Sequence, residues 1–291
     1  MSSELRGKIE VLSPAKINLN LFITGKREDG YHMLETVMVP VSIYDRIWIE
    51  VNFDGLGTIM FGDRTSNNIP KNSSNIAYRA IELFFKETGK VADVLLDIEK
   101  NIPVEAGLGG GSSNGASVLK ALNELFLFPL SNDRLEKISS ALGADVPFFI
   151  KSVPALCTGI GDEIQPLGFF EKKYILLVYP GKGLSTAKVY KKLNWGLTNK
   201  IKKNKRLVSE YGCFESLAKG NDLQGPAEEI MPELIEIKKL FFGFDGCNSV
   251  MSGSGPSMVG LFASEYYRNQ AFKMIVKETK PLWKIYKAEF C

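Results

Sequence analysis

Alternating apolar positions predict several strands in this chain. Ile17, Leu19, Leu21 and Ile23 recur at every second position, so they form one face of a strand and the residues between them form the other. Short apolar runs bounded by turn residues predict further strands, which cover residues 37–51, 94–98, 174–179 and 258–262.

Apolar residues at helical spacing predict helices among these strands. The predicted helices cover residues 75–85, 112–126, 133–142 and 230–242. We expect Ser112 or Ser113 to cap the second helix, and Asp133 to start the third with Glu136 as its capping partner. Gly143 is a natural end for the third helix, and Pro147 stops it.

Residues 150–161 mix proline, glycine and small side chains, which predicts a break in the chain. Strand and helix patterns occur on both sides of it. We therefore expect an α+β protein with two domains, residues 1–155 and 156–291. A chain of 291 residues is long enough for two such domains, each with a core.

The charge balance argues against several partners. There are 36 basic and 33 acidic residues, so a net charge of +3 does not favour nucleic acid. Residues 191–206 are rich in lysine, but their one aromatic residue is Trp195, which favours a solvated surface loop over an RNA-binding segment. No apolar run approaches the roughly 18–20 residues that cross a membrane, so no membrane partner is expected.

Cysteine and histidine content narrows the chemistry. The 4 cysteines form no C-x-x-C pair, which favours a protein of the reducing cytoplasm. His32 is the single histidine, so a zinc site built from several histidines is excluded, and no G-x-S-x-G motif supports a serine hydrolase. Catalysis must then use carboxylates, lysines, hydroxyls and backbone amides.

The segment PVEAGLGGGSSNGA, residues 103–116, predicts an anion-binding loop. Its glycines cluster between a strand and a helix, and the free amides and dipole of the first helical turn favour an anion. A flexible linker or a helix cap is the alternative. The spacing fits neither the P-loop nor the dinucleotide fingerprint, because Ser112 stands where a glycine would be required and no lysine follows it.

Three segments in this order resemble the motifs of the GHMP small-molecule kinases. They are SPAKINLNL at residues 13–21, the glycine loop, and MSGSGPS at residues 251–257. DGYH at residues 29–32 and LGADVPFF at residues 142–149 strengthen a resemblance that covers nearly the whole chain. The resemblance implies a two-domain α+β fold with the active site in the cleft between the domains.

The same resemblance implies an enzyme that transfers a phosphoryl group from ATP, with Mg²⁺, to an alcohol of a small molecule. The residues expected to bind ATP are Pro103, Val104, Glu105, Ala106, Gly107, Leu108, Gly109, Gly110, Gly111, Ser112 and Ser113. Ser112 or Ser113 could also reach Mg²⁺. Glu124 and Glu136 are available carboxylates, but neither lies in a motif, so the metal ligands are left unassigned.

Asp145 and Lys16 are the expected catalytic residues. The family pattern has its catalytic base in the GADVPFF stretch, where Asp145 would accept the proton of the acceptor hydroxyl. Lys16 lies on the polar face of a strand whose other face is apolar, so it should line a cleft, keep Asp145 ionised and polarise the hydroxyl. An aspartate that caps a helix or lies in a turn is the alternative for Asp145, and a surface lysine is the alternative for Lys16.

The details match most closely those family members that phosphorylate a cytidine diphosphate-linked methylerythritol in isoprenoid biosynthesis. Tyr31 and His32 are then expected to recognise cytosine, with Tyr190 opposite, and Asn18 to bind substrate oxygens. Tyr31 as a core aromatic residue and His32 as a turn residue are the alternatives. A homoserine or mevalonate type of GHMP kinase, or a non-catalytic GHMP-like binding protein, would be the competing function.

Overall fold

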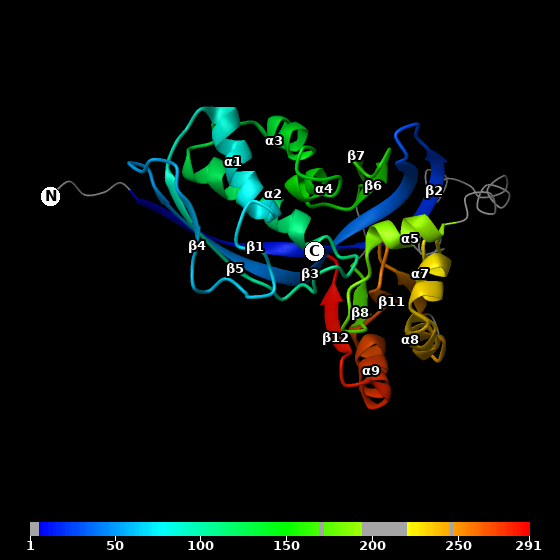
Figure 1. Cartoon of the computed structure of the whole chain (residues 1–291). Coiled ribbons are helices and arrows are strands. Elements are labelled where there is room, and N and C mark those ends of the chain that lie inside the picture. The colour runs from blue at the N-terminus through cyan, green and yellow to red at the C-terminus, as the bar shows by residue number, and fades with distance from the viewer. Residues whose placement is uncertain (1–5, 169–171, 194–219, 245–246) are drawn as a thin grey trace. The chain divides into compact units, whose positions relative to one another are not determined.

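The computed structural model describes residues 6–168, 172–193, 220–244 and 247–291 (Figure 1). The chain forms two compact units. Unit 1 comprises residues 1–15, 43–102 and 109–152, and unit 2 comprises residues 16–42, 103–108 and 153–291. These units are discontinuous in sequence, so the division into residues 1–155 and 156–291 stays a prediction.

Unit 1 combines paired strands with four helices. Two long strands, β1 (Arg6–Asn18) and β3 (His32–Asn52), pass from one unit into the other, and β1 pairs with β3. In unit 1, β3 pairs with β5 (Asp93–Glu99) in antiparallel register, and β4 (Ile59–Phe61) pairs with β5 in parallel register.

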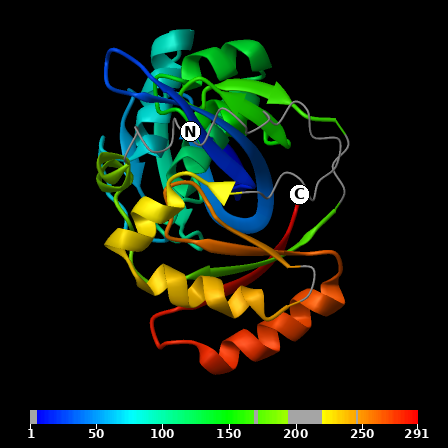
Figure 2. The same cartoon turned by 90° about the vertical axis from the view of Figure 1, so that its right-hand side faces the viewer.

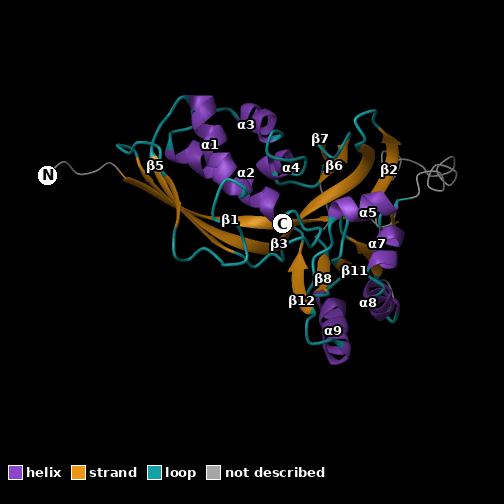
Figure 3. Cartoon of the chain, viewed as in Figure 1, coloured by secondary structure: helices purple, strands orange, loops and turns teal. Residues whose placement is uncertain are grey.

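The unit 1 helices gather on one side of these strands (Figure 3). They are α1 (Ile76–Thr88), α2 (Gly110–Leu125), α3 (Asn132–Ser139) and α4 (Val146–Lys151). Helix α2 packs against the other three. Its first residues belong to the glycine loop, so the packing of α2 positions that end of the loop.

Local capping explains where these helices begin. The Asn75 side chain accepts a hydrogen bond from the amide of Ala77, as predicted for an N-terminus there. The predicted cap of α2 at Ser112 or Ser113 is wrong, because Gly109 is the N-cap, with a left-handed φ of 67° that glycine tolerates. The cap of α3 is Ser131 rather than Asp133, since the Ser131 hydroxyl accepts from the amide of Arg134 at 3.3 Å.

In unit 2, β2 (Asn20–Lys26) pairs with β3 in antiparallel register and with β9 (Gly220–Asn221) in parallel register. Strand β6 (Ala155–Thr158) pairs with β3 and with β7 (Glu163–Pro166). The single strand predicted for residues 17–23 is interrupted at Leu19, where a bend separates β1 from β2.

A separate four-stranded antiparallel sheet also belongs to unit 2. Its order is β10 (Asn248–Met251), β11 (Met258–Phe262), β8 (Tyr174–Tyr179) and β12 (Lys284–Glu289). Strands β8 and β11 have the predicted bounds. Helices α8 (Glu233–Phe242) and α9 (Glu265–Ile275) lie together on one face of this sheet (Figure 2).

The helix predicted for residues 230–242 is α8, which begins three residues later than predicted, and the separate helix α7 (Gln224–Ile230) precedes it. Helix α7 ends before Met231, and α8 begins after Pro232. Proline has no amide hydrogen and disfavours helical backbone in the residue before it, which is why the two helices are separate here. Helix α5 (Thr186–Lys192) and a short 3₁₀ helix (Val276–Glu278) complete unit 2.

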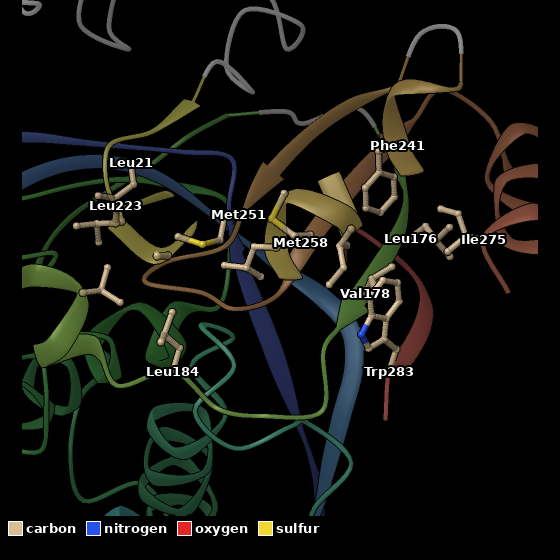
Figure 4. Close-up of a cluster of buried hydrophobic side chains, with 14 of the residues drawn as sticks. Leu21, Leu176, Val178, Leu184, Leu223, Phe241, Met251, Met258, Ile275 and Trp283 are labelled. Carbon is tan, nitrogen blue, oxygen red and sulfur yellow. The ribbon is translucent and has the colours of Figure 1, made fainter. Parts of the chain in front are cut away.

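The sheet and its helices enclose an apolar core (Figure 4). Leu176 and Val178 of β8 contribute to it together with Phe241 of α8 and Ile275 of α9, all of them buried. Burying side chains of this size contributes about 1.5–3 kcal/mol each. At the edge of the core, Trp283 donates from Nε1 to the Glu233 carboxylate at 2.6 Å.

Within the described ranges, no helix combines the length and the apolar character that a membrane span requires.

Candidate active site

Three of the sequence motifs are joined by hydrogen bonds within unit 2. The amide of Lys16 donates to the carbonyl of Leu108 at 2.9 Å. The amide of Asn18 donates to the hydroxyl of Ser252 at 3.2 Å, and this hydroxyl donates to the carbonyl of Gly107 at 2.9 Å. The SPAKINLNL segment, the first half of the glycine loop and the MSGSGPS segment are therefore held together.

The MSGSGPS segment forms the turn between β10 and β11, and it also contacts the glycine loop. A β-carbon on Gly107 would overlap the carbonyl oxygen of Ser252, and Gly107 has a φ of +75°. Glycine is thus required at position 107 by the approach of another backbone segment. The MSGSGPS segment is thus both a hairpin turn and a neighbour of the glycine loop.

Lys16 is buried, and its orientation is fixed by its neighbour. Its side-chain Nζ donates to Oδ1 of Asn18 at 2.5 Å, and Lys16 is 3% exposed. The Nδ2 atom of Asn18 donates to the hydroxyl of Thr36 at 2.7 Å, which in turn donates to the carbonyl of Asn20 at 2.5 Å. The alternative of a surface lysine is wrong, since this ammonium lies inside a hydrogen-bonded network on β1, β2 and β3.

The second half of the glycine loop belongs to unit 1 and forms the first turn of α2. Gly111 is exposed, and a β-carbon there would lie 3.6 Å from Ile76 Cδ1, an ordinary contact. Ser112 is partly exposed, whereas Ser113 is fully buried with its hydroxyl 2.7 Å from the hydroxyl of Ser13. Of the two predicted serines, Ser112 is therefore the one accessible to a ligand.

A buried ion pair lies next to this turn, and no sequence pattern indicated it. Asp45 has no exposed surface, and the Lys100 ammonium donates to its carboxylate. Burial lowers the pKa of Lys100, while the negative charge of Asp45 and the hydrogen bond to it act in the opposite direction. The two residues are 55 positions apart, so only the pairing of β3 with β5 brings them together.

Asp145 precedes α4 in unit 1 and is partly buried. It lies in a turn at the N-cap position of α4, but its side chain makes no capping hydrogen bond to the helix, so only the capping half of the alternative is wrong. Two neighbouring contacts hold its segment: Arg79 donates to the carbonyl of Leu142 at 3.1 Å, and Lys120 donates to the carbonyl of Phe149 at 3.0 Å. Lys16 belongs to unit 2, and the pairing of Asp145 with it stays a prediction.

His32 and Tyr190 lie together in unit 2. Their rings are stacked with centroids 5.2 Å apart and planes 29° from parallel. Burial and, to a lesser extent, the positive charge of Lys26 lower the pKa of His32. Tyr31 is 63% exposed, so it is not the core residue that the sequence allowed as an alternative. The basic residues 194–206 lie outside the described residues.

A pocket of about 300 Å³ opens beside the glycine loop within unit 2. Its walls come from Glu105 and Gly107, from the start of α5 and from the MSGSGPS turn; the lining residues are Glu105, Gly107, Leu184, Ser185, Thr186, Ala187 and Gly255. The hydroxyls of Thr186 and Ser254 are 2.7 Å apart at one side of it. The glycine loop and the MSGSGPS turn therefore line the same pocket.

Glu124 and Glu136, the two carboxylates that the sequence offered as metal ligands, are poorly placed to hold an ion at the glycine loop. Glu124 is exposed near the far end of α2, about 18 Å along the helix from Ser112 at ~1.5 Å per residue. Glu136 pairs with Lys151 at 2.7 Å. No group of three or more histidine, cysteine, aspartate or glutamate side chains is arranged for a metal ion in the part of the chain that the structure describes.

Comparison with known proteins shows the family of this chain. Residues 75–152 match the family described as GHMP kinases N terminal domain, and residues 203–280 match the one described as GHMP kinases C terminal. A 4-diphosphocytidyl-2-C-methyl-D-erythritol kinase of Syntrophus aciditrophicus (strain SB) is 39% identical over 271 residues, which cover 92% of this chain and 95% of the relative.

Solved structures show the same fold. A crystal structure of 4-(cytidine 5'-diphospho)-2C-methyl-D-erythritol kinase superposes with a TM-score of 0.79 and 31% identity, covering 97% of this chain and 100% of the other. The mevalonate kinase of Methanococcus jannaschii superposes with a TM-score of 0.71 over 98% of this chain and 99% of its own, at 14% identity, which supports the fold alone.

The family matches and the superposition show that the chain belongs to the GHMP kinases, and the predicted α+β fold of that family is confirmed. Within this family, the chain belongs with the proteins named 4-diphosphocytidyl-2-C-methyl-D-erythritol kinase.

Proposed function

We propose that this protein transfers the γ-phosphoryl group of ATP to the 2-hydroxyl of 4-diphosphocytidyl-2-C-methyl-D-erythritol, which gives the 2-phosphate and ADP. The observation that carries the proposal is similarity to relatives named 4-diphosphocytidyl-2-C-methyl-D-erythritol kinase, which extends over about nine tenths of the chain. The reaction would belong to the non-mevalonate route to isoprenoid precursors, in the cytoplasm.

Asp145 is proposed as the base that accepts the proton of the acceptor hydroxyl. Asp145 stands at the start of α4, and its side chain makes no capping hydrogen bond to that helix. Lys16 is proposed to stabilise the negative charge that develops on the hydroxyl oxygen. The bond to Asn18 supports this role, since it holds the ammonium in one orientation.

Asn18 is proposed to contribute to the acceptor site in two ways. Both polar atoms of its amide already have a partner, Lys16 at Oδ1 and Thr36 at Nδ2. The amide oxygen has a second lone pair, which can accept from a substrate hydroxyl, and the amide nitrogen has a second hydrogen, which can be donated to a substrate oxygen. Asn18 would thus orient Lys16 and bind the alcohol.

The cytosine ring is proposed to bind at Tyr31, His32 and Tyr190. A neutral histidine offers one donor and one acceptor, which suits the edge of a pyrimidine, and tyrosine rings offer stacking surfaces. His32 and Tyr190 stack directly on each other in this structure. Binding of a base between them would therefore require one of these rings to move.

ATP is proposed to bind along residues 103–113. The free amides of the first turn of α2 and its dipole favour the phosphates. Mg²⁺ suits this site as the partner of the phosphates rather than as a resident ion, because it is commonly held by one or two protein oxygens together with phosphates and water. The Ser112 hydroxyl is the proposed protein donor, and bound Mg²⁺ would neutralise phosphate charge.

The test is phosphorylation of a panel of acceptors by the purified protein with ATP and Mg²⁺, followed by ³¹P NMR. The cytidylated alcohol, the same alcohol without its cytidine diphosphate group, homoserine and mevalonate form the panel. The proposal predicts a new phosphomonoester signal with the cytidylated alcohol alone. Phosphorylation of homoserine or mevalonate at a similar or greater rate would contradict it. A protein that phosphorylates none of the four acceptors would contradict it as well.

A further inference from the structure

A row of buried polar side chains lies directly beside the first turns of α2. Asp45 is at its centre, and its carboxylate accepts from the Lys100 ammonium and from the backbone amides of Asn101 and Ile102 at 2.8 and 2.9 Å. Asp45 has no exposed surface, and the Lys100 side chain is 4% exposed. The pair is therefore almost completely removed from water.

The row continues from this ion pair to the glycine loop. The Nδ2 atom of Asn114 donates to Asp45 at 2.9 Å and to the hydroxyl of Ser13 at 3.0 Å, while its Oδ1 accepts from Lys100 at 3.0 Å. The hydroxyls of Ser13 and Ser113 are 2.7 Å apart. We call Lys100, Asp45, Asn114, Ser13 and Ser113 the buried polar chain.

The buried polar chain contacts the first residues of α2 and includes two residues of that helix. A β-carbon on Gly110, the first residue of the helix, would lie 3.1 Å from the Lys100 nitrogen. Ser113 and Asn114 are the fourth and fifth residues of the same helix. Strands β1 and β3 and the end of β5 are thus connected to the turn that carries the free amides.

As a packing element alone, the buried polar chain would contribute little to the stability of the fold. A buried ion pair has to offset the desolvation of both charges, and apolar side chains of similar volume are often at least as stable. A cation at the N-terminus of a helix is also disfavoured by the helix dipole. What directional hydrogen bonds provide, and apolar packing does not, is a single defined position for the groups that they connect.

We propose that the buried polar chain fixes the first turn of α2 so that its amides are preorganised for the phosphates of ATP. The inference rests on the proposed function in one respect, the assignment of residues 103–113 to ATP. Asp45, Lys100, Asn114 and Ser13 are then positioning residues. Ser113 is a positioning residue as well, because its hydroxyl is buried against Ser13 instead of facing a ligand.

The first test compares two asparagines of the same helix. Asn114 and Asn123 are both 3% exposed, and the Asn123 amide is likewise engaged, with the backbone of Leu130 at 2.9 and 3.0 Å. The dissociation constant of a non-hydrolysable ATP analogue with Mg²⁺ is measured by calorimetry, and stability by thermal unfolding. Both Asn114→Ala and Asn123→Ala should lower the melting temperature, and Asn114→Ala alone should weaken nucleotide binding, by roughly tenfold.

The second test separates positioning from direct contact. Ser13→Ala and Ser113→Ala each remove one side of the same hydrogen bond, and Ser13→Ala also removes an acceptor of Asn114. Positioning therefore predicts a loss of nucleotide affinity in both variants, at least as large in Ser13→Ala, and little further loss in the double variant. If Ser113 instead bound the nucleotide, Ser113→Ala alone would weaken binding and Ser13→Ala would not. The Ser13→Ala variant leaves the ion pair intact, so it carries the test should Asn114→Ala fail to fold.

Two results would overturn the inference: nucleotide affinity unchanged in Ser13→Ala and Asn114→Ala, or an equal loss in Asn123→Ala. Because no acceptor is present in these measurements, they are independent of acceptor identity. A protein that binds the analogue in the predicted pattern but phosphorylates no cytidylated alcohol would refute the proposed function and support the inference. A wild-type protein that binds no ATP analogue would refute both.

Discussion

At the residue scale, the charge of His32 bears most directly on the proposed acceptor site. Its pKa is lowered from 6.5, first by burial and then by the nearby Lys26. The ring is therefore neutral near pH 7, and one nitrogen remains able to accept a hydrogen bond. Protonation would convert that acceptor into a donor and change what the ring can recognise.

We predict that KM for the cytidylated acceptor is constant between about pH 7 and 8 and rises as the pH falls below 6.5. The direction follows because a lowered pKa delays protonation to more acidic pH. Initial rates across the pH range, with ATP saturating, give the profile. In His32→Asn, which keeps a donor and an acceptor without titrating, the low-pH rise should vanish. A wild-type rise centred above pH 6.5 would contradict the assignment.

The sequence predicted the interior position of Lys16 but not the ion pair between Asp45 and Lys100. The burial of Lys16 followed from the alternation of SPAKINLNL, because its apolar face required an interior strand. Asp45 and Lys100 could not be found this way, since each has the pattern of an ordinary charged residue, Asp45 within a strand and Lys100 directly after one. Their pairing depends on contacts between segments far apart in sequence.

At the scale of elements, the glycine loop contains glycines with different requirements. Gly107 has no room for a β-carbon and a φ of +75°, whereas Gly111 is helical and has room for one. The sequence presented them as one cluster, because spacing does not say which backbone approaches which glycine. The matching substitutions therefore separate structure from ligand binding.

Gly107→Ala should destabilise the protein by about 1–3 kcal/mol through the contact with Ser252 and the left-handed backbone. Gly111→Ala should leave stability unchanged or raise it by roughly 0.5–1 kcal/mol, since alanine favours a helix. If the exposed face of Gly111 meets phosphate, its variant should nevertheless bind an ATP analogue more weakly. Chemical unfolding and calorimetry measure the two effects. Equal stability of both variants would be evidence against this account of the loop.

Elements with a clear period were predicted well, and their ends less so. Strands β8 and β11 were predicted with their observed bounds because uniform apolar runs end at turn residues. The start of α2 was placed at a serine, whereas Gly109 caps the helix through its backbone conformation, which no side chain reveals. The helix predicted for residues 230–242 ended where expected, but it began three residues too early, because Pro232 is the N-cap of α8.

At the scale of the whole molecule, the proposed catalytic groups are distributed over both compact units. Lys16 belongs to unit 2 and Asp145 to unit 1, and the glycine loop passes from unit 2 to unit 1 after Leu108. The family motifs could be recognised in sequence because each is local. Whether Lys16 and Asp145 act on one hydroxyl is a property of the complete chain, and it requires a measurement on the complete chain.

The most direct measurement is a double-mutant cycle on kcat for transfer to the cytidylated alcohol, with wild type, Lys16→Met, Asp145→Asn and the double variant. Asp145→Asn should lower kcat by about 10²–10⁴ if it is the base. If the two side chains act as one unit, the double variant should be little slower than the slower single variant. A single variant with near wild-type kcat, or losses that multiply in the double variant, would contradict the account.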